Sequence, residues 1–281
     1  MRTGKWIALF ALVAAGMGPA AAVADDNCDF RADRSAGMDA AGVARIVIRA
    51  GAGELKVRGV ADGRRIEAKG TACAGQQALL DRLQVTVRRD RDVVYVETQM
   101  PQDKENWSWG RNEDAYIDLG ITLPASITIE AVDSSGDATF EDLHSLAVQD
   151  SSGDLDIARI AGALDVGDSS GDVEIEKAGS VRLRDSSGDL DVDDVRGDVV
   201  VENDSSGDIE IAQVAGNVTV DNDSSGSIRV EDVRGNVTVN NDSSGDIYAG
   251  RVKGDFTVRS DSSGGISHAA IGGKISVPRA D

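Results

Sequence analysis

Aspartate and serine are the residues of this sequence that could do chemistry, because they recur together at an almost constant spacing. The tetrapeptide Asp-Ser-Ser-Gly occurs eight times, and successive copies begin 17 to 19 residues apart, at Asp133, Asp150, Asp168, Asp185, Asp204, Asp223, Asp242 and Asp261. In most copies another Asp follows the glycine, as at Asp154, Asp172, Asp189 and Asp208. Clustered carboxylates can bind Ca²⁺, which takes oxygen ligands, or can accept hydrogen bonds from the N–H groups of a turn.

The repeated serines do not predict a catalytic nucleophile. A nucleophilic serine needs its own base and a group that orients that base, whereas these serines recur in every copy and the chain has only two histidines, His144 and His268. A polysaccharide-cleaving β-helix enzyme, a less favoured alternative, would need one distinctive carboxylate cluster in a cleft. The repeat spreads the carboxylates evenly, so we predict a protein that is not an enzyme and has no catalytic residues.

The elements that position these residues follow from the rest of the repeat. With each Asp as position 1, positions 6, 8, 11, 15 and 17 are apolar, as in Ile209, Ile211, Val214, Val218 and Val220. This is period-two alternation in two short segments rich in β-branched residues, which predicts two strands for each copy. Glycines at positions 4 and 13 are expected to supply the corners.

One copy cannot fold alone. Burying five aliphatic side chains contributes about 10 kcal/mol at about 2 kcal/mol each, and ordering 19 residues costs at least as much. Stacked copies can share their buried faces and pair their backbones. We therefore predict an all-β protein, a parallel β-solenoid with about eight turns over 125–281, preceded by a β-rich N-terminal cap over 25–124.

Stacking turns each repeat position into a column, so the aspartates come within about 4.8 Å of one another and repel. Two arrangements would offset the repulsion. In one, Asp and Ser side chains accept hydrogen bonds from the N–H groups of the turn, while Asn and Ser side chains form hydrogen bonds between turns. In the other, oxygens of neighbouring turns hold Ca²⁺ as a structural cofactor, although the Gly-Gly-x-Gly-x-Asp calcium repeat is absent.

The beginning of the chain predicts export. Arg2 and Lys5 precede an apolar run, and Ala22-Val23-Ala24 resembles a cleavage site, so 1–24 is expected to be a signal peptide that leaves no membrane span in the mature chain. In an oxidising compartment Cys28 and Cys73, the only cysteines, would form one structural disulfide. The expected location is the periplasm or the cell surface.

Within the cap, 44–50, 53–57, 65–69, 83–88, 93–98 and 116–123 alternate like strands, and 76–82 resembles a short helix. Trp107 and Trp109 lie in a polar stretch, where they could stack on a sugar or a protein partner or pack on the cap itself. The other end of the solenoid would be open, so self-association there is a further possibility.

The charge balance excludes several partners. The chain has 49 acidic and 29 basic residues, a net charge of −20, and 31 of the acids but only 12 of the bases lie from Asp133 onward. Such a chain is a poor match for nucleic acid or anionic lipid, since both carry phosphates.

The repeat also resembles a known family. Leu123-Pro124-Ala125 followed by Asp-Ser-Ser-Gly-Asp copies is similar, over about 40–277, to a bacterial putative-adhesin family with β-strand repeats, a domain of unknown function, and to the head domains of autotransporter adhesins. The resemblance implies an exported β-solenoid with a role in adhesion and supplies no catalytic residues. We expect a cell-envelope scaffold that contacts an envelope protein or glycan; a calcium-binding structural module is the alternative.

Overall fold

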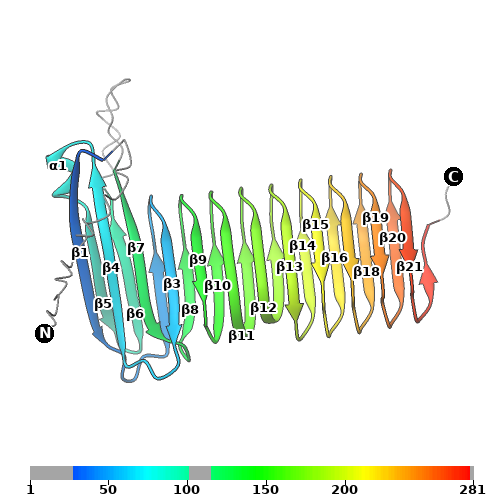
Figure 1. Ribbon diagram of the computed structural model, residues 1–281, viewed down its shortest axis with the longest axis horizontal. Helices are drawn as coiled ribbons and strands as arrows, with labels where there is room; N and C mark the ends of the chain where they lie inside the picture. Colours follow the sequence, from blue (N-terminus) through cyan, green and yellow to red (C-terminus); the bar gives the residue numbers. More distant parts are fainter. Residues whose placement is uncertain (1–27, 101–114, 279–281) are drawn as a thin grey trace, which may run out of the picture.

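The computed structural model describes residues 28–100 and 115–278, and it shows a long, flattened β-solenoid with a cap at its N-terminal end (Figure 1). This confirms the predicted fold class. Each turn contributes one strand to each of two rows, and two corners connect the rows. None of the helices in the described ranges is long and apolar enough to cross a membrane.

The first row begins in the cap and continues through every turn. Its strands lie in the order β1 (Phe30–Asp39), β4 (Arg65–Ala74), β7 (Ala115–Pro124), β3 (Leu55–Val60), β9 (Ala138–Glu141), the first part of β11 (Leu155–Gly167), the first part of β12 (Val173–Arg184), β13 (Leu190–Val195), β15 (Ile209–Ala212), β17 (Ile228–Glu231), β19 (Ile247–Gly250) and β21 (Ile266–Ala269).

The second row faces the first across the core. Its strands are β5 (Gln84–Asp90), β6 (Val93–Gln99), β2 (Arg45–Arg49), β8 (Thr128–Val132), β10 (Ser145–Gln149), the later parts of β11 and β12, β14 (Val199–Asn203), β16 (Val218–Asp223), β18 (Val237–Asp242), β20 (Phe256–Asp261) and β22 (Ile275–Ser276). Because β11 and β12 run through a corner, the two rows form one continuous 22-stranded sheet.

The register places equivalent residues of successive copies side by side. Ile209 pairs with Ile228, and Ile228 pairs with Ile247, in parallel ladders. The alternating apolar residues therefore point into one continuous core, where Ile209 and Val220 are fully buried. Each turn buries its apolar side chains against the turns beside it, as the repeat requires.

The cap uses antiparallel pairing, which the repeat turns do not. β1 pairs antiparallel with β4, β4 with β7, and β5 with β6, while the helix α1 (Gln77–Leu80) follows β4. A disulfide between Cys28 and Cys73 joins the chain just before β1 to the end of β4. The antiparallel strands and the disulfide therefore give the first end of the solenoid a structure different from the repeat turns.

The N-terminal region also supplies one turn of the solenoid. β2 and β3 pair in parallel with β8 and β9, and Gly53 has the same positive φ as the repeat glycines. The predicted segment 25–124 thus contains a solenoid turn as well as the cap. The repeat did not reveal this turn, because Ala50-Gly51-Ala52-Gly53 occupies the place of Asp-Ser-Ser-Gly.

The two corners differ from the expectation that glycines at positions 4 and 13 supply both. The position-4 glycines have φ between 106° and 141°, which only glycine adopts readily. At the other corner the positive φ, between 53° and 62°, falls on position 10, which is never glycine in the repeat copies. Position 13 needs glycine for a different reason, because the backbone of the neighbouring turn leaves no room for a side chain. A Cβ at Gly216 would lie 2.4 Å from the carbonyl oxygen of Gly197.

Candidate functional site

The Asp-Ser-Ser-Gly corner joins a second-row strand to the next first-row strand in every turn. The backbone reverses at the glycine, so the Asp at position 1 points into the solenoid and the Asp at position 5 points outward. The first set is buried and the second is exposed. The repeat therefore creates two columns of carboxylates with opposite environments.

The inner column, which we call the aspartate column, is almost inaccessible to solvent. Its side chains are 0–6% exposed in the first seven copies, Asp133, Asp150, Asp168, Asp185, Asp204, Asp223 and Asp242, and Asp261 in the last copy is half-buried. Only one of these seven receives a hydrogen bond of good geometry, at 3.2 Å, from Ser225 N to Asp223 Oδ1. Buried carboxylates without donors are costly in their charged form.

Burial raises the pKa of the column carboxyl groups, and repulsion from neighbouring aspartates adds to this effect. The pKa is raised to about 7 for Asp133 and Asp223 and to about 6 for Asp185. The pKa is also raised to about 6 for Asp150, Asp168 and Asp204. Serine N–H groups that follow each Asp act in the opposite direction and lower the pKa, but desolvation is the larger effect. These six carboxyl groups therefore have pKa values of about 6 to 7, well above the ordinary value of an aspartate.

The outer aspartates at position 5 instead form a hydrogen-bonded ladder. Asp189 N donates to Asp172 Oδ1 at 2.9 Å, and Asp208 N donates to Asp189 Oδ1 at 2.8 Å. The series continues on both sides with the same geometry, at Asp154, Asp172, Ser227 and Gly265. Each exposed carboxylate thus accepts the N–H group of the next turn in a charge-assisted bond.

Serine and asparagine form further ladders between turns. The position-3 serine donates from Oγ to the position-2 carbonyl oxygen of the turn before, as Ser206 does to Ser186 O at 3.4 Å. Asn222 Nδ2 donates to Asn203 Oδ1 at 3.2 Å, and Asn241 repeats this contact with Asn222. These bonds give the position-3 serines and the asparagines a structural role.

One copy, Gly167-Asp168-Ser169-Ser170-Gly171, also fits the Gly-x-Ser-x-Gly pattern of hydrolases. Ser169 lies at a solenoid corner between parallel strands rather than at a strand-to-helix elbow. His144, the nearest histidine in the sequence, lies at the opposite corner. The arrangement does not supply the base that a nucleophilic serine needs.

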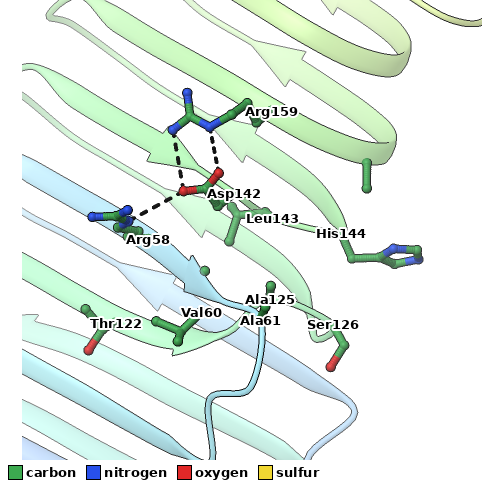
Figure 2. A pocket seen from close by; sticks show the side chains of 12 residues that line it. Arg58, Val60, Ala61, Thr122, Ala125, Ser126, Asp142, Leu143, His144 and Arg159 are labelled. Carbon is green, nitrogen blue, oxygen red and sulfur yellow. Dashed lines mark hydrogen bonds and ion pairs between the residues drawn. The ribbon is translucent and has the colours of Figure 1, made fainter.

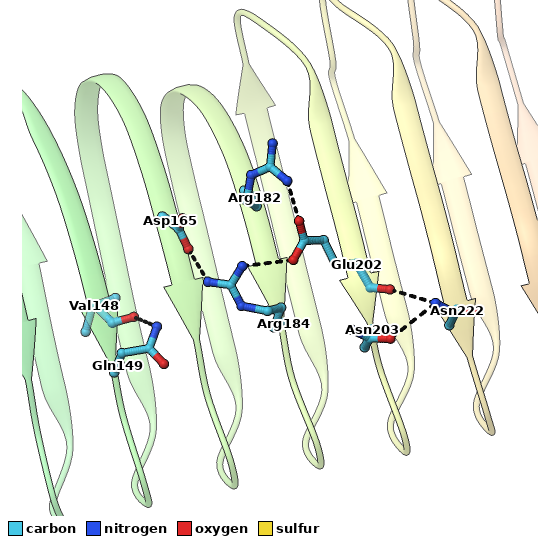
Figure 3. Close-up of polar contacts among 8 residues, drawn as sticks. All are labelled: Val148, Gln149, Asp165, Arg182, Arg184, Glu202, Asn203 and Asn222. Atoms are coloured by element: carbon cyan, nitrogen blue, oxygen red, sulfur yellow. Dashed lines mark hydrogen bonds and ion pairs between the residues drawn. The ribbon is translucent and has the colours of Figure 1, made fainter.

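The outer surface of the second row carries ion pairs between turns (Figure 3). Arg184 lies between two acids, with Nη2 at 2.5 Å from Asp165 Oδ1 and Nη1 at 2.8 Å from Glu202 Oε2. Arg182 also reaches Glu202, and Asn222 donates to the Glu202 carbonyl oxygen. These exposed contacts hold neighbouring turns in register and add modestly to stability.

The corner opposite the aspartate column is hollowed along much of the solenoid. One depression, of about 730 Å³, lies where β3 and the segment after β7 meet the first repeat turns. Figure 2 shows Arg58 and Arg159 on different sides of Asp142, with Arg159 Nε at 2.6 Å from Oδ1 and Arg58 Nε at 3.5 Å from Oδ2. His144 points away from this group.

Sequence reasoning missed this corner. Its charged residues lie at positions 10 and 12, which vary between copies, so no motif marked them. The signal that could have found them is that position 12 carries Arg196, Arg234 and Lys253 but no acid in any copy. The predicted partner contacts Trp107 and Trp109 and the predicted signal peptide lie outside the described residues.

The donor set for a calcium ion is incomplete. Within 28–100 and 115–278, no three His, Cys, Asp or Glu side chains converge so that they could hold a metal ion. The aspartate column offers one carboxylate from each turn, whereas Ca²⁺ takes six to eight oxygens in known sites. Calcium remains a prediction from the sequence.

The architecture and the repeated corners define a class: a parallel β-solenoid whose repeated polar residues form columns along its axis. The chain belongs to the family described as Toastrack DUF4097, which matches residues 44–269. A search of curated proteins finds no match.

Several solved structures are similar to this chain at low sequence identity. A putative adhesin from Bacteroides fragilis is 13% identical, with a TM-score of 0.41, and the match covers 88% of this chain and 97% of that one. A putative cell adhesion protein from Clostridium sporogenes is 10% identical, with a TM-score of 0.28 and coverage of 88% and 99%. A putative lipid binding protein from Parabacteroides distasonis is 14% identical, with a TM-score of 0.39 and coverage of 88% and 97%.

Proposed function

We propose that this protein is an exported, non-enzymatic scaffold of the cell envelope, whose solenoid presents a rigid surface for adhesion or for contact with an envelope protein or glycan. The observation that carries this proposal is the uniformity of the rod. The same side chains recur in register from turn to turn, and their hydrogen bonds connect one turn to the next. Such a surface suits extended contact more than chemistry at one point.

Two features support export. The sequence begins with a predicted signal peptide, and Cys28 and Cys73 form a disulfide, a bond typical of oxidising compartments. Fractionation of cells that express the full chain tests this directly. We expect the mature protein, shortened at about residue 24 and with no free thiol, in the envelope or the medium; a full-length, reduced protein in the cytosol would contradict export.

The scaffold role is tested by capture and reconstitution. The mature chain, 25–281, is immobilised and exposed to envelope extract, and each captured component is purified and bound again on its own. Direct binding of a purified envelope protein or glycan is expected. Release of reducing ends from a panel of envelope polysaccharides by the mature chain would contradict the non-enzymatic part of the proposal.

A calcium-binding structural module is the second candidate, and the unpartnered oxygens of the aspartate column favour it. If Ca²⁺ occupies the column, a chelator should lower the melting temperature of the mature chain and added Ca²⁺ should restore it. Asp185→Asn should weaken that response, and Asp191→Asn, an exposed change in the same turn, should leave it intact. An unchanged melting temperature throughout a calcium titration would eliminate this candidate.

A further inference from the structure

Three depressions along the corner opposite the aspartate column form one groove. The largest, about 730 Å³, shares Arg159 and Ala161 with a second of about 300 Å³. The second shares Asp194 and Arg196 with a third of about 480 Å³. The groove, which we call the corner groove, therefore follows the long axis of the solenoid from β3 to the turn that contains β19.

The charge of the corner groove is opposite to that of the protein. Three cations come from position 10, Arg159, Lys177 and Arg251, three come from position 12, Arg196, Arg234 and Lys253, and Arg58 adds a seventh. Asp142, Asp194 and Asp232 also line it, and Glu141, Glu176 and Glu231 pair with Arg159, Lys177 and Arg251 from beside it, so the seven cations exceed these six acids by one. The whole chain carries −20, so even a small local excess of positive charge sets the corner groove apart from the average surface.

The two rows of cations differ in their partners. The position-10 cations form ion pairs within the protein: Arg159 pairs with Asp142, Arg251 with Asp232, and Lys177 with Glu176. In the position-12 row, Arg196 donates to the Ala161 carbonyl oxygen at 2.5 Å. Among the described residues, no carboxylate pairs with Arg196, Arg234 or Lys253. All three side chains are exposed, so this row is available to a ligand.

The spacing of the position-12 cations indicates the kind of anion. At about 4.8 Å for each turn, Arg234 lies about 10 Å along the axis from Arg196 and about 5 Å from Lys253. In duplex DNA each strand carries a phosphate about every 3.4 Å along the axis, which is denser than the position-12 cations, and the remaining phosphates would lie against acidic flanks. A linear polymer with one carboxylate on some or all of its sugars matches the row better.

We propose that the corner groove binds a linear acidic polysaccharide, with Arg196, Arg234 and Lys253 contacting its carboxylates. The two guanidinium groups can bind carboxylates through paired N–H donors, and the lysine acts as a point charge. The groove runs along the rod, so successive sugars contact successive turns. The inference rests on the proposed scaffold function and names the chemical class of its glycan ligand.

The test measures binding of the mature, disulfide-bonded chain to polygalacturonate, with neutral dextran and a thymidine oligonucleotide as comparisons. The groove variant is Arg196→Ala/Arg234→Ala/Lys253→Ala. The control variant, Arg182→Ala/Arg229→Ala/Arg259→Ala, removes the same charge from exposed residues outside the corner groove. Circular dichroism and the melting temperature establish that both variants are folded.

We expect the wild type to bind polygalacturonate at low salt, more weakly at high salt, and not to bind dextran. The groove variant should bind about tenfold or more weakly, since three modest charge contacts are lost together, and the control should stay within about twofold. Absence of polygalacturonate binding, equal losses in both variants, or equally tight oligonucleotide binding would each overturn the assignment. If the groove assignment failed while a purified envelope partner still bound, the scaffold role would stand.

Discussion

Replacement of one column aspartate by its neutral isostere should make the protein more stable at neutral pH. Asp185 is 4% exposed, and neither of its carboxylate oxygens receives a hydrogen bond of good geometry. Burial, first, and the Asp204 charge raise the pKa of Asp185 to about 6 from an ordinary value of 3.8, while the N–H groups of the serines that follow oppose the shift. In Asp185→Asn the side chain keeps its shape but cannot ionise.

The sign of the pH dependence follows from this raised pKa. The folded chain holds the Asp185 proton more tightly than the unfolded chain, so the contribution to stability is complete below about pH 4 and is lost as pH rises through about 6. A shift of about two units corresponds to about 3 kcal/mol. About half of this contribution to stability is lost as the pH rises to 5, and the remainder is lost by about pH 7.

The assay is urea unfolding of the mature, oxidised chain at pH 5.0 and pH 7.5, followed by far-UV circular dichroism. The stability advantage of Asp185→Asn over the wild type should grow by about 1–1.5 kcal/mol between these two pH values. Asp191→Asn removes an exposed charge from the same turn and should show no comparable growth. A lower stability of Asp185→Asn at pH 7.5 would refute the reasoning, because it would mean that the turn stabilises the charged carboxylate.

Three further changes test other contacts. Gly226→Ala would place a Cβ 1.7 Å from a backbone oxygen at φ 129°, so it should lower the free energy of unfolding by about 3 kcal/mol or more, or prevent folding. The control is Gly120→Ala, whose Cβ would lie 3.7 Å from its nearest atom. This control should cost under about 1 kcal/mol in the same urea titration. Replacing both Cys28 and Cys73 by serine should lower stability by about 2–4 kcal/mol; equal melting temperatures with and without the bond would contradict this. Asp208→Ala removes the acceptor of an N–H group at 2.7 Å and should cost about 1 kcal/mol, and Asp208→Asn should recover most of it if the hydrogen bond is the cause.

The solenoid could be predicted because the repeat fixes which side chains share a face. Apolar residues at positions 6 and 8 of one copy, such as Leu190 and Val192, can be buried only against their equivalents, Ile209 and Ile211, and the structure pairs them. The turn formed by β2 and β3 escaped prediction because pairing in a solenoid depends on shape and not on the Asp-Ser-Ser-Gly motif.

The candidate sites were harder to predict because the sequence does not show where the chain bends. The sequence did not distinguish the inner from the outer aspartates, since Asp185 and Asp189 are the same residue type four positions apart. Their environments diverge only when Gly188 turns the backbone. The corner groove depends in the same way on positive φ at residues such as Lys177 and Arg251, whose residue types rarely adopt it.

The two ends of the rod give it a mechanical direction. At the first end, antiparallel strands and a disulfide fasten the chain, so any opening there must break the cap as a unit. At the far end β22 has two residues, β21 is largely exposed, and in the described part of the chain neither has a strand beyond it. A stack whose turns contact only their neighbours opens from its weakest terminus. Under tension the protein should therefore peel turn by turn from its C-terminal end, while the part nearest the cap stays folded longest.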